Sequence, residues 1–273
     1  MSQTFFATYN DGREVAIQMP DASEEVIPGV PWGRFDRFFT PAFWFARAWY
    51  GQQTGGYSRY RLGNTLREEI VACLLGGHGM PAEVGLAAFA RLRERGLLGG
   101  EVSSESEFHK ALVEPLSING RSIRYRYPNQ RAKLISKAII RLDQETPPHH
   151  DDLAFREWLL RFDGIGLKTA SWVTRNFLDS QNVAILDVHI FRAGVLAGVF
   201  SLNDSIQSHY LRMEERFLRF TRSLGVDPAM FDTLIWYEMR QMASLALEAM
   251  DDHAGLKSQK RRFSHPQIEF ALT

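Results

Sequence analysis

The sequence predicts a mainly α-helical protein with two helical lobes and a small β-hairpin at the N-terminus. From about residue 41 onward, apolar residues recur at three- and four-residue spacing, as in "DDLAFREWLLRF", which is typical of amphipathic helices. Near the N-terminus, "TFFATYNDGREVAIQMP" alternates around Asn10-Asp11-Gly12 and predicts a hairpin. Little else resembles a strand, although "RSIRYRY" could form a short extended piece.

Capping residues, prolines and glycines place the ends of the helices in the first half. One predicted helix ends at Gly76-Gly77, and the next begins at Pro81 and stops at Gly96, because proline suits a first turn and glycine suits a helix end. Ser104 and Glu107 form a capping box at the start of "SESEFHKALVEPL". A further helix is predicted in "PNQRAKLISKAIIRLDQ".

Aspartates begin the helices of the second half. Asp151 or Asp152 caps one helix, and Asp187 can cap "VHIFRAGVLAGVF". "SHYLRMEERFLRFTRSLG" ends at Gly225, and Asp227-Pro228 then opens one long helix that we expect to run to about residue 250.

Composition bounds the class of protein. The 273 residues are 45% hydrophobic and 23% charged, which is enough to bury a sizeable core. There is no apolar run of about 18 residues and no signal-peptide pattern, so we expect a cytoplasmic protein without a membrane partner. The single cysteine, Cys73, excludes a disulfide framework and any four-cysteine zinc or iron–sulfur site within the chain.

Charge is unevenly distributed, although the net charge is zero, which by itself argues mildly against a nucleic-acid partner. Residues 121–141 hold seven basic residues and no acidic residue. Such a stripe could neutralise the phosphates of a nucleic acid. The alternative is an ordinary solvated helix face.

The segment "RFDGIGLKTASW" places Gly164 and Gly166 between two predicted helices. A phosphate-binding loop and a dinucleotide-binding turn are excluded, since the glycine spacing is wrong and no strand precedes it. The pattern instead indicates a helix-hairpin-helix element at 163–167, whose second helix could present backbone N–H groups to a DNA phosphate. A simple connection between two helices is the alternative.

Together, "GIGLKTAS" and "LDVHIFR" resemble the active-site segment of the helix-hairpin-helix (HhH-GPD) DNA glycosylase superfamily. The resemblance is strongest to its lysine-bearing, bifunctional 8-oxoguanine branch, including the archaeal type. It is specific over residues 153–200 and weaker over 121–142. It implies a two-lobed helix-hairpin-helix DNA glycosylase fold over 41–252, with residues 1–40 as an N-terminal extension and 253–273 as a tail.

The resemblance implies a catalytic pair, Lys168 and Asp187. Displacing a base from C1′ of deoxyribose builds positive charge that a carboxylate stabilises, and a neutral amine can capture C1′ as a Schiff base. His189 corresponds to a histidine that approaches a DNA phosphate, with a structural histidine as the alternative. One departure from the family is Asp163, since the family's Leu-Pro-Gly is replaced here by Phe-Asp-Gly. A carboxylate at that position could weaken the anchoring of a phosphate.

Further roles follow from the same resemblance. Trp172, one turn after Lys168, and Trp236 would sandwich the extruded base, while Asp232 would accept hydrogen bonds from its edge. Both tryptophans could instead be core residues. Four residues of the basic stretch would contact DNA, some of them filling the space left by the base: Asn129, Gln130, Arg131 and Lys133. Asn129 could instead cap the helix that follows Pro128.

The predicted function is base-excision repair: removal of an oxidised purine, above all 8-oxoguanine, with AP-lyase activity. The resemblance implies a monomer acting on double-stranded DNA that contains a damaged base. It also implies no cofactor and no iron–sulfur cluster, and allows a structural monovalent cation at the hairpin. The alternatives are the same fold acting on another damaged or modified base, and a non-catalytic DNA-binding protein. Retention of both Lys168 and Asp187 argues against the second, because binding needs neither.

Overall fold

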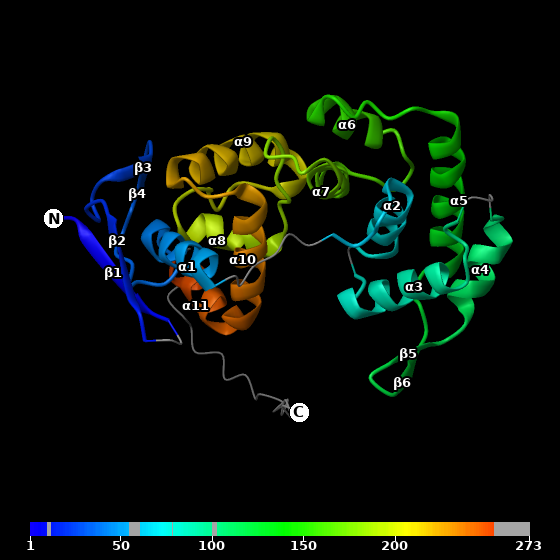
Figure 1. Ribbon diagram of the computed structural model, residues 1–273, viewed down its shortest axis with the longest axis horizontal. Helices are drawn as coiled ribbons and strands as arrows, with labels where there is room; N and C mark the ends of the chain where they lie inside the picture. Colours follow the sequence, from blue (N-terminus) through cyan, green and yellow to red (C-terminus); the bar gives the residue numbers. More distant parts are fainter. Residues whose placement is uncertain (10–11, 55–60, 78, 100–102, 254–273) are drawn as a thin grey trace.

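The computed structural model has two helical lobes with one helix, α7, lying between them (Figure 1). The structure describes residues 1–9, 12–54, 61–77, 79–99 and 103–253. Within these ranges there are eleven helices and three separate two-stranded antiparallel sheets, so the mainly α prediction is confirmed. None of the described helices is long and apolar enough to cross a membrane.

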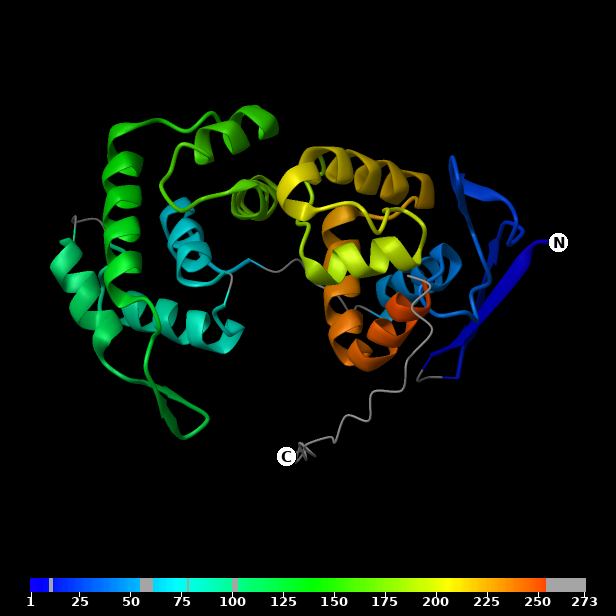
Figure 2. The ribbon, with the colours of Figure 1, turned by 180° about the vertical axis from the view of Figure 1, so that it is seen from behind.

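The first lobe contains both the beginning and the end of the described chain. Its helices are α1 (Pro41–Thr54), α8 (Val188–Leu196), α9 (Ile206–Leu224), α10 (Pro228–Gln241) and α11 (Ala243–His253). The second lobe contains α2 (Leu66–Leu75), α3 (Ala82–Glu94), α4 (Glu105–Val113), α5 (Pro128–Gln144) and α6 (Asp152–Leu159), and α7 (Leu167–Leu178) packs against α2 and α6. The chain therefore crosses between the lobes twice, after α1 and after α7 (Figure 2).

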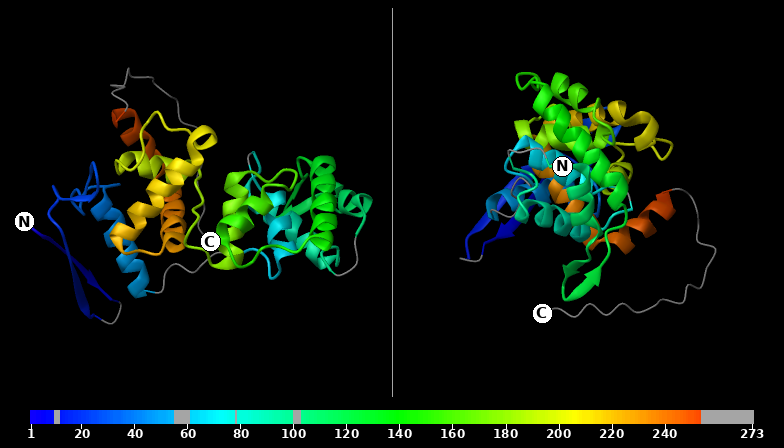
Figure 3. Two further views of the ribbon diagram at one scale, coloured as in Figure 1. Left: turned by 90° about the horizontal axis from the view of Figure 1, so that it is seen from above. Right: turned by 90° about the vertical axis from the view of Figure 1, so that its right-hand side faces the viewer.

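Residues 1–40 lie at the outer end of the first lobe (Figure 3). They form the predicted hairpin, β1 (Gln3–Thr8) with β2 (Glu14–Met19), and a second small pair, β3 (Glu25–Ile27) with β4 (Val30–Pro31). Asn10 and Asp11 of the predicted turn lie outside the described residues. Met19, Val30 and Trp32 are buried in one core with α8, α9 and α10, so the segment that we expected to be an extension contributes to the core of this lobe.

The last sheet is a hairpin that the sequence analysis recognised only as a short extended piece. It pairs β5 (Leu116–Ile118) with β6 (Arg121–Ile123). Asn119 and Gly120 connect the strands with φ angles of 50° and 73°. Asn-Gly with two positive φ angles is the signature of a type I′ turn, so the signal for this hairpin was present in the sequence.

Most predicted helix ends are confirmed. Ser104 and Glu107 form the capping box, and Asp151 and Asp187 cap α6 and α8 through their side chains. The predicted long last helix is wrong, however, because the chain turns at Met242 into a separate helix, α11. Neither glycine nor proline marks this turn. After this turn, α11 contacts α8 and Ala246 is buried.

Two buried ion pairs connect the elements around α7. Arg156 of α6 pairs with Glu214 of α9, and Arg175 of α7 pairs with Asp232 of α10. All four side chains are at most 7% exposed. Because α6 belongs to the second lobe and α9 and α10 to the first, these pairs tie the two lobes together through charges that water cannot screen.

We expect Glu214→Leu to lower the free energy of unfolding by about 3–5 kcal/mol, since it strands the buried Arg156 guanidinium without a partner. Arg156→Met combined with Glu214→Leu should recover part of that loss, because no buried charge then remains, although the Ala184 N–H and the Ser171 hydroxyl still lack the Glu214 carboxylate. Chemical denaturation of the two single variants and the double variant measures this. A double variant as unstable as the sum of the singles would contradict the assignment.

Candidate active site at the junction of the lobes

The hairpin before α7 is a tight turn in which Gly164 has φ +82°. A Cβ atom on Gly164 would lie 2.7 Å from Leu134 Cδ1 of α5, so glycine is needed both for the backbone conformation and for the close approach of α5. Gly166 is the N-cap of α7, with φ −100° and open space where a Cβ would lie. The sequence pattern does not distinguish the two glycines, but the structure requires glycine at position 164 and not at position 166.

Asp163 of the hairpin forms an ion pair with Lys137 of α5, with Nζ and Oδ2 2.6 Å apart. This lysine lowers the pKa of the Asp163 carboxyl below its usual range, first through the hydrogen bond and then through its charge. Asp163 therefore does not present an uncompensated negative charge beside the N-terminus of α7. No side chain of the described residues caps that terminus, so its first N–H groups are available to an anion.

Lys168 lies in the first turn of α7 and is half-buried. Among the described residues its Nζ has no hydrogen-bond or ion-pair partner. Its charge acts on Cys73 of α2 and on His189 of α8, which places the amine where the two lobes and α7 meet.

Asp187 is the N-cap of α8. Its Oδ1 accepts hydrogen bonds from the backbone N–H groups of His189 and Ile190, at 2.8 and 3.0 Å. Its Oδ2 accepts none from the described part of the chain. One oxygen is thus fixed by the helix and the other is available, which is the arrangement required of a carboxylate that must stabilise charge on a substrate.

His189 connects these groups electrostatically. Its half-buried ring feels the charges of Asp187 and Lys168, and also those of Arg192 and Arg240. Burial lowers the pKa of His189 below its ordinary value; Asp187 opposes this shift and the three cations add to it. The imidazole is therefore neutral at pH 7 in the free protein, and the surroundings of Asp187 are rich in positive charge.

The residues proposed for the base pocket differ in how accessible they are. Trp172 is half-buried, and its Nε1 is buried with no hydrogen-bond partner among the described residues. Trp236 is 36% exposed, and the guanidinium of Arg240 lies 4.6 Å from its ring centroid. Trp236 therefore keeps an exposed ring surface, and Trp172 keeps an unpaired N–H donor, whereas buried polar atoms in a protein core are normally hydrogen-bonded.

The i, i+4 spacing suggested that Asp232 and Trp236 lie on one accessible face of α10. In the structure, however, Asp232 is not exposed as Trp236 is. It is 5% exposed, and both of its oxygens accept hydrogen bonds from Arg175. Burial raises its pKa to about 6, although Arg175 and the backbone N–H of Ile185 lower it. To accept from the edge of a base, Asp232 would first have to give up a bond to Arg175, a residue that the sequence analysis did not single out.

In the basic stretch, some of the candidate DNA contacts are exposed, and one forms a hydrogen bond within the protein. Asn129, Gln130 and Lys133 are exposed near the start of α5. Arg131 is half-buried and donates to the Gly76 carbonyl at 3.3 Å, while its buried Nε has no partner in the described part of the chain. Tyr127 is the N-cap of α5, so the alternative role of Asn129 as its cap is wrong.

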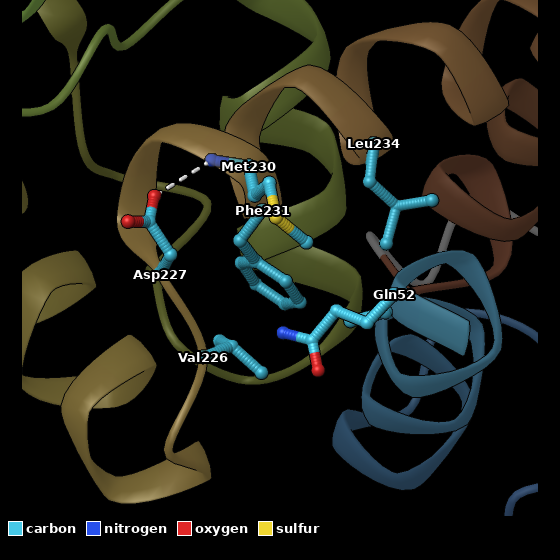
Figure 4. A pocket seen from close by; sticks show the side chains of 7 residues that line it. Gln52, Val226, Asp227, Met230, Phe231 and Leu234 are labelled. Carbon is cyan, nitrogen blue, oxygen red and sulfur yellow. Dashed lines mark hydrogen bonds between the residues drawn. The ribbon is translucent and has the colours of Figure 1, made fainter. Parts of the chain in front are cut away.

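A shallow hollow elsewhere on the first lobe is separate from this site. Figure 4 shows its lining from α1 and the start of α10, including Gln52, Asp227, Phe231 and Leu234. These α10 residues lie on a different side of the helix from Asp232 and Trp236, because each residue advances by 100°. The hollow holds none of the candidate residues.

Within the described ranges, no group of three or more histidine, cysteine, aspartate or glutamate side chains could hold a metal ion. His149 instead lies beside the rings of Phe155 and Phe177, and Asp151 caps α6. The possible monovalent cation at the hairpin stays a prediction.

Comparison with known proteins identifies the region that carries this site. A family model described as 8-oxoguanine DNA glycosylase matches residues 57–226, more than half of the chain. A Thermoplasma acidophilum protein named 8-oxoguanine DNA glycosylase/AP lyase is 30% identical over 63% of this chain and 79% of its own length. A Saccharolobus islandicus protein of the same name is 30% identical over 43% of this chain, and the match spans only 61% of that relative.

A solved structure shows the same relationship. The 8-oxoguanine DNA glycosylase of Thermotoga maritima is 27% identical in sequence and aligns with a TM-score of 0.50, covering 63% of this chain and 78% of that one. The similarity therefore extends over most of the length of that structure.

We expect Gly164→Ala to destabilise the protein by at least about 1 kcal/mol, because alanine is strained at a positive φ and its Cβ would collide with Leu134. Gly166→Ala is the matched control: its Cβ would meet no atom and its φ suits alanine, so only the N-cap preference for glycine is lost, which we expect to cost about 0.5 kcal/mol. Thermal unfolding of both variants tests this difference. Equal losses would show that the hairpin does not depend on Gly164.

Proposed function

Because the chain belongs to the 8-oxoguanine DNA glycosylase family, we propose that it removes 8-oxoguanine from double-stranded DNA and then cuts the strand at the abasic site. The names of the Thermoplasma and Saccharolobus relatives support both halves of this activity. One observation carries the proposal: the Lys168 amine and the Asp187 carboxylate both lie near His189. Among the described residues, neither the amine nor Asp187 Oδ2 has a hydrogen-bond partner.

The proposed reaction uses these two side chains directly. As the bond between C1′ and N9 of the base breaks, positive charge develops on the sugar, and the Asp187 carboxylate stabilises it. The neutral amine of Lys168 forms a bond to C1′, and the base leaves with the electron pair and takes up a proton. The nitrogen bound to C1′ then loses one proton, and the bond between C1′ and O4′ breaks as O4′ takes up a proton, which leaves a protonated Schiff base. Removal of a proton from C2′ then breaks the bond between C3′ and oxygen, and β-elimination expels the 3′ phosphate.

Positioning of the DNA would come from both lobes. The uncapped N-terminus of α7 suits a backbone phosphate, and exposed residues of α5, namely Asn129, Gln130 and Lys133, suit the strand around the vacated position. Arg192 and Arg240 add positive charge near Asp187, and the neutral ring of His189 lies among these groups. All of these groups belong to one chain, so the proposed activity does not require a second copy.

The base would lie between Trp172 and Trp236. Stacking on aromatic rings is worth about 1–3 kcal/mol per base, which offsets much of the cost of extruding it from the duplex. The unpartnered Trp172 Nε1 supplies a donor, and Asp232 supplies an acceptor if Arg175 releases one of its oxygens. A purine with N–H donors on its edge fits this set better than a pyrimidine.

We expect the wild-type protein to form a borohydride-trapped complex with a duplex that contains one 8-oxoguanine, and none with the undamaged duplex. Lys168→Gln should abolish trapping while duplex binding persists, because the amine that forms the Schiff base is gone. Lys110→Gln is the control: it removes an exposed lysine of α4 that is in no proposed DNA contact, so trapping should stay intact. Trapping by Lys168→Gln would place the nucleophile elsewhere. Trapping of the wild type on an abasic duplex alone would point to a different base.

Asp187→Asn should slow single-turnover base release by about 100-fold or more, because the amide cannot stabilise developing positive charge as a carboxylate does. Its side-chain oxygen can still cap α8, so the melting temperature should change little. Asp151→Asn is the matched control, since Asp151 caps α6 in the same way, through Oδ1 to the N–H groups of Leu153 and Ala154. Unchanged base release in Asp187→Asn would remove this residue from the mechanism.

A further inference from the structure

The segment that leads into Asp187, residues 183–186, is buried but forms neither helix nor strand. Val183, Ala184 and Leu186 are fully buried and Ile185 is 8% exposed. Backbone N–H and C=O groups buried without regular structure must find other partners, because leaving them unpaired costs free energy. Here the partners are side chains.

Three consecutive residues of this segment are bound by side chains of α9 and α10. Ala184 N–H donates to Glu214 Oε1 at 2.9 Å. Ile185 N–H donates to Asp232. Leu186 N–H donates to the Tyr210 hydroxyl at 3.2 Å, and that hydroxyl donates in turn to the Ala184 carbonyl at 2.8 Å.

The same side chains are fixed to the helices beside the segment. Glu214 pairs with Arg156 of α6 and accepts a hydrogen bond from Ser171 of α7 at 3.2 Å. Asp232 pairs with Arg175 of α7. The position of Asp187 relative to the helix that carries Lys168 is therefore set through these side chains rather than through backbone pairing.

We infer that Tyr210 and Glu214 are positioning residues for catalysis: together they fix the backbone of residues 184–186 and thereby hold the Asp187 carboxylate in register with Lys168. Tyr210 contributes most directly, because its single hydroxyl joins two backbone groups within three residues of Asp187. The effect of Tyr210 and Glu214 on catalysis rests on the proposed function. Their hydrogen bonds to the backbone of residues 184–186 do not depend on it.

Tyr210→Phe tests this inference with little change in shape, since the ring stays and only the hydroxyl is lost. Tyr125→Phe is the matched control: Tyr125 is also buried, and its hydroxyl donates to the Leu75 carbonyl at 2.7 Å, inside the second lobe. Both variants lose one buried hydroxyl that binds a backbone carbonyl. Only one of these hydroxyls lies beside the segment that ends at Asp187.

The first measurement is amide hydrogen exchange. We expect peptides covering residues 183–190 to exchange at least about fivefold faster in Tyr210→Phe and to be unchanged in Tyr125→Phe, since local opening follows the loss of local hydrogen bonds. This readout does not depend on the activity. Unchanged exchange over 183–190 in Tyr210→Phe would overturn the inference.

The second measurement is single-turnover release of 8-oxoguanine over a range of enzyme concentrations. The maximal rate of Tyr210→Phe should fall about tenfold or more, because small misplacements of catalytic groups are costly, while the concentration for half-maximal rate stays within about twofold. Tyr125→Phe should keep the wild-type rate. If Tyr210→Phe exchanges faster over residues 183–190 but keeps the wild-type maximal rate, Tyr210 is not a positioning residue for catalysis. A wild-type protein that releases no 8-oxoguanine would refute the proposed function instead, and the exchange result would still decide whether Tyr210 holds the segment.

Discussion

The pairing of buried charges around α7 is the constraint on which the rest of the site depends. Arg156 with Glu214, and Arg175 with Asp232, join elements that belong to different lobes. A buried ion pair adds little net stability compared with apolar packing, but the loss of one partner is costly, so an arrangement of the helices that separated the partners would be unfavourable. Because the chain crosses between the lobes twice, this single arrangement sets how the start of α7 faces the start of α8.

The N-termini of α7 and α8 carry the two groups proposed for catalysis, an amine on α7 and a carboxylate on α8. Within the described ranges, no side chain caps the start of α7, and the amine of Lys168 in its first turn has no hydrogen-bond or ion-pair partner. At α8 the terminus is capped by Asp187, which uses one oxygen for the helix and leaves the other available. Positive charge from Lys168, Arg192 and Arg240 surrounds the neutral His189. A polyanion would be attracted to this region even though the net charge of the chain is zero.

The sequence predicted the parts of this structure that depend on local chemistry. Caps such as Ser104 and Asp187 act on N–H groups two or three residues away, so they can be recognised without the fold. The pairing of Arg175 with Asp232 joins residues 57 positions apart, and no local pattern distinguishes it from a carboxylate facing a ligand. The turn at Met242 likewise follows from burial of α11 against α8, a tertiary effect without a local signal. The Asn119-Gly120 hairpin, in contrast, was local and could have been recognised.

The pairing of Asp163 with Lys137 shows how a departure from the family pattern is accommodated by a residue in another element. Taken alone, a carboxylate beside the N-terminus of α7 would repel a phosphate and compete for the same N–H groups. Lys137 lies on α5, the helix whose Leu134 also packs against the hairpin at Gly164, so the position of the cation is fixed by the same contact that shapes the turn. Both charged groups are about half exposed, at 53% and 57%, so salt screens them and the pair itself adds little stability. Its effect is on the local field: the aspartate and lysine form a neutral unit, and the uncapped helix terminus is left as the feature that a phosphate would meet.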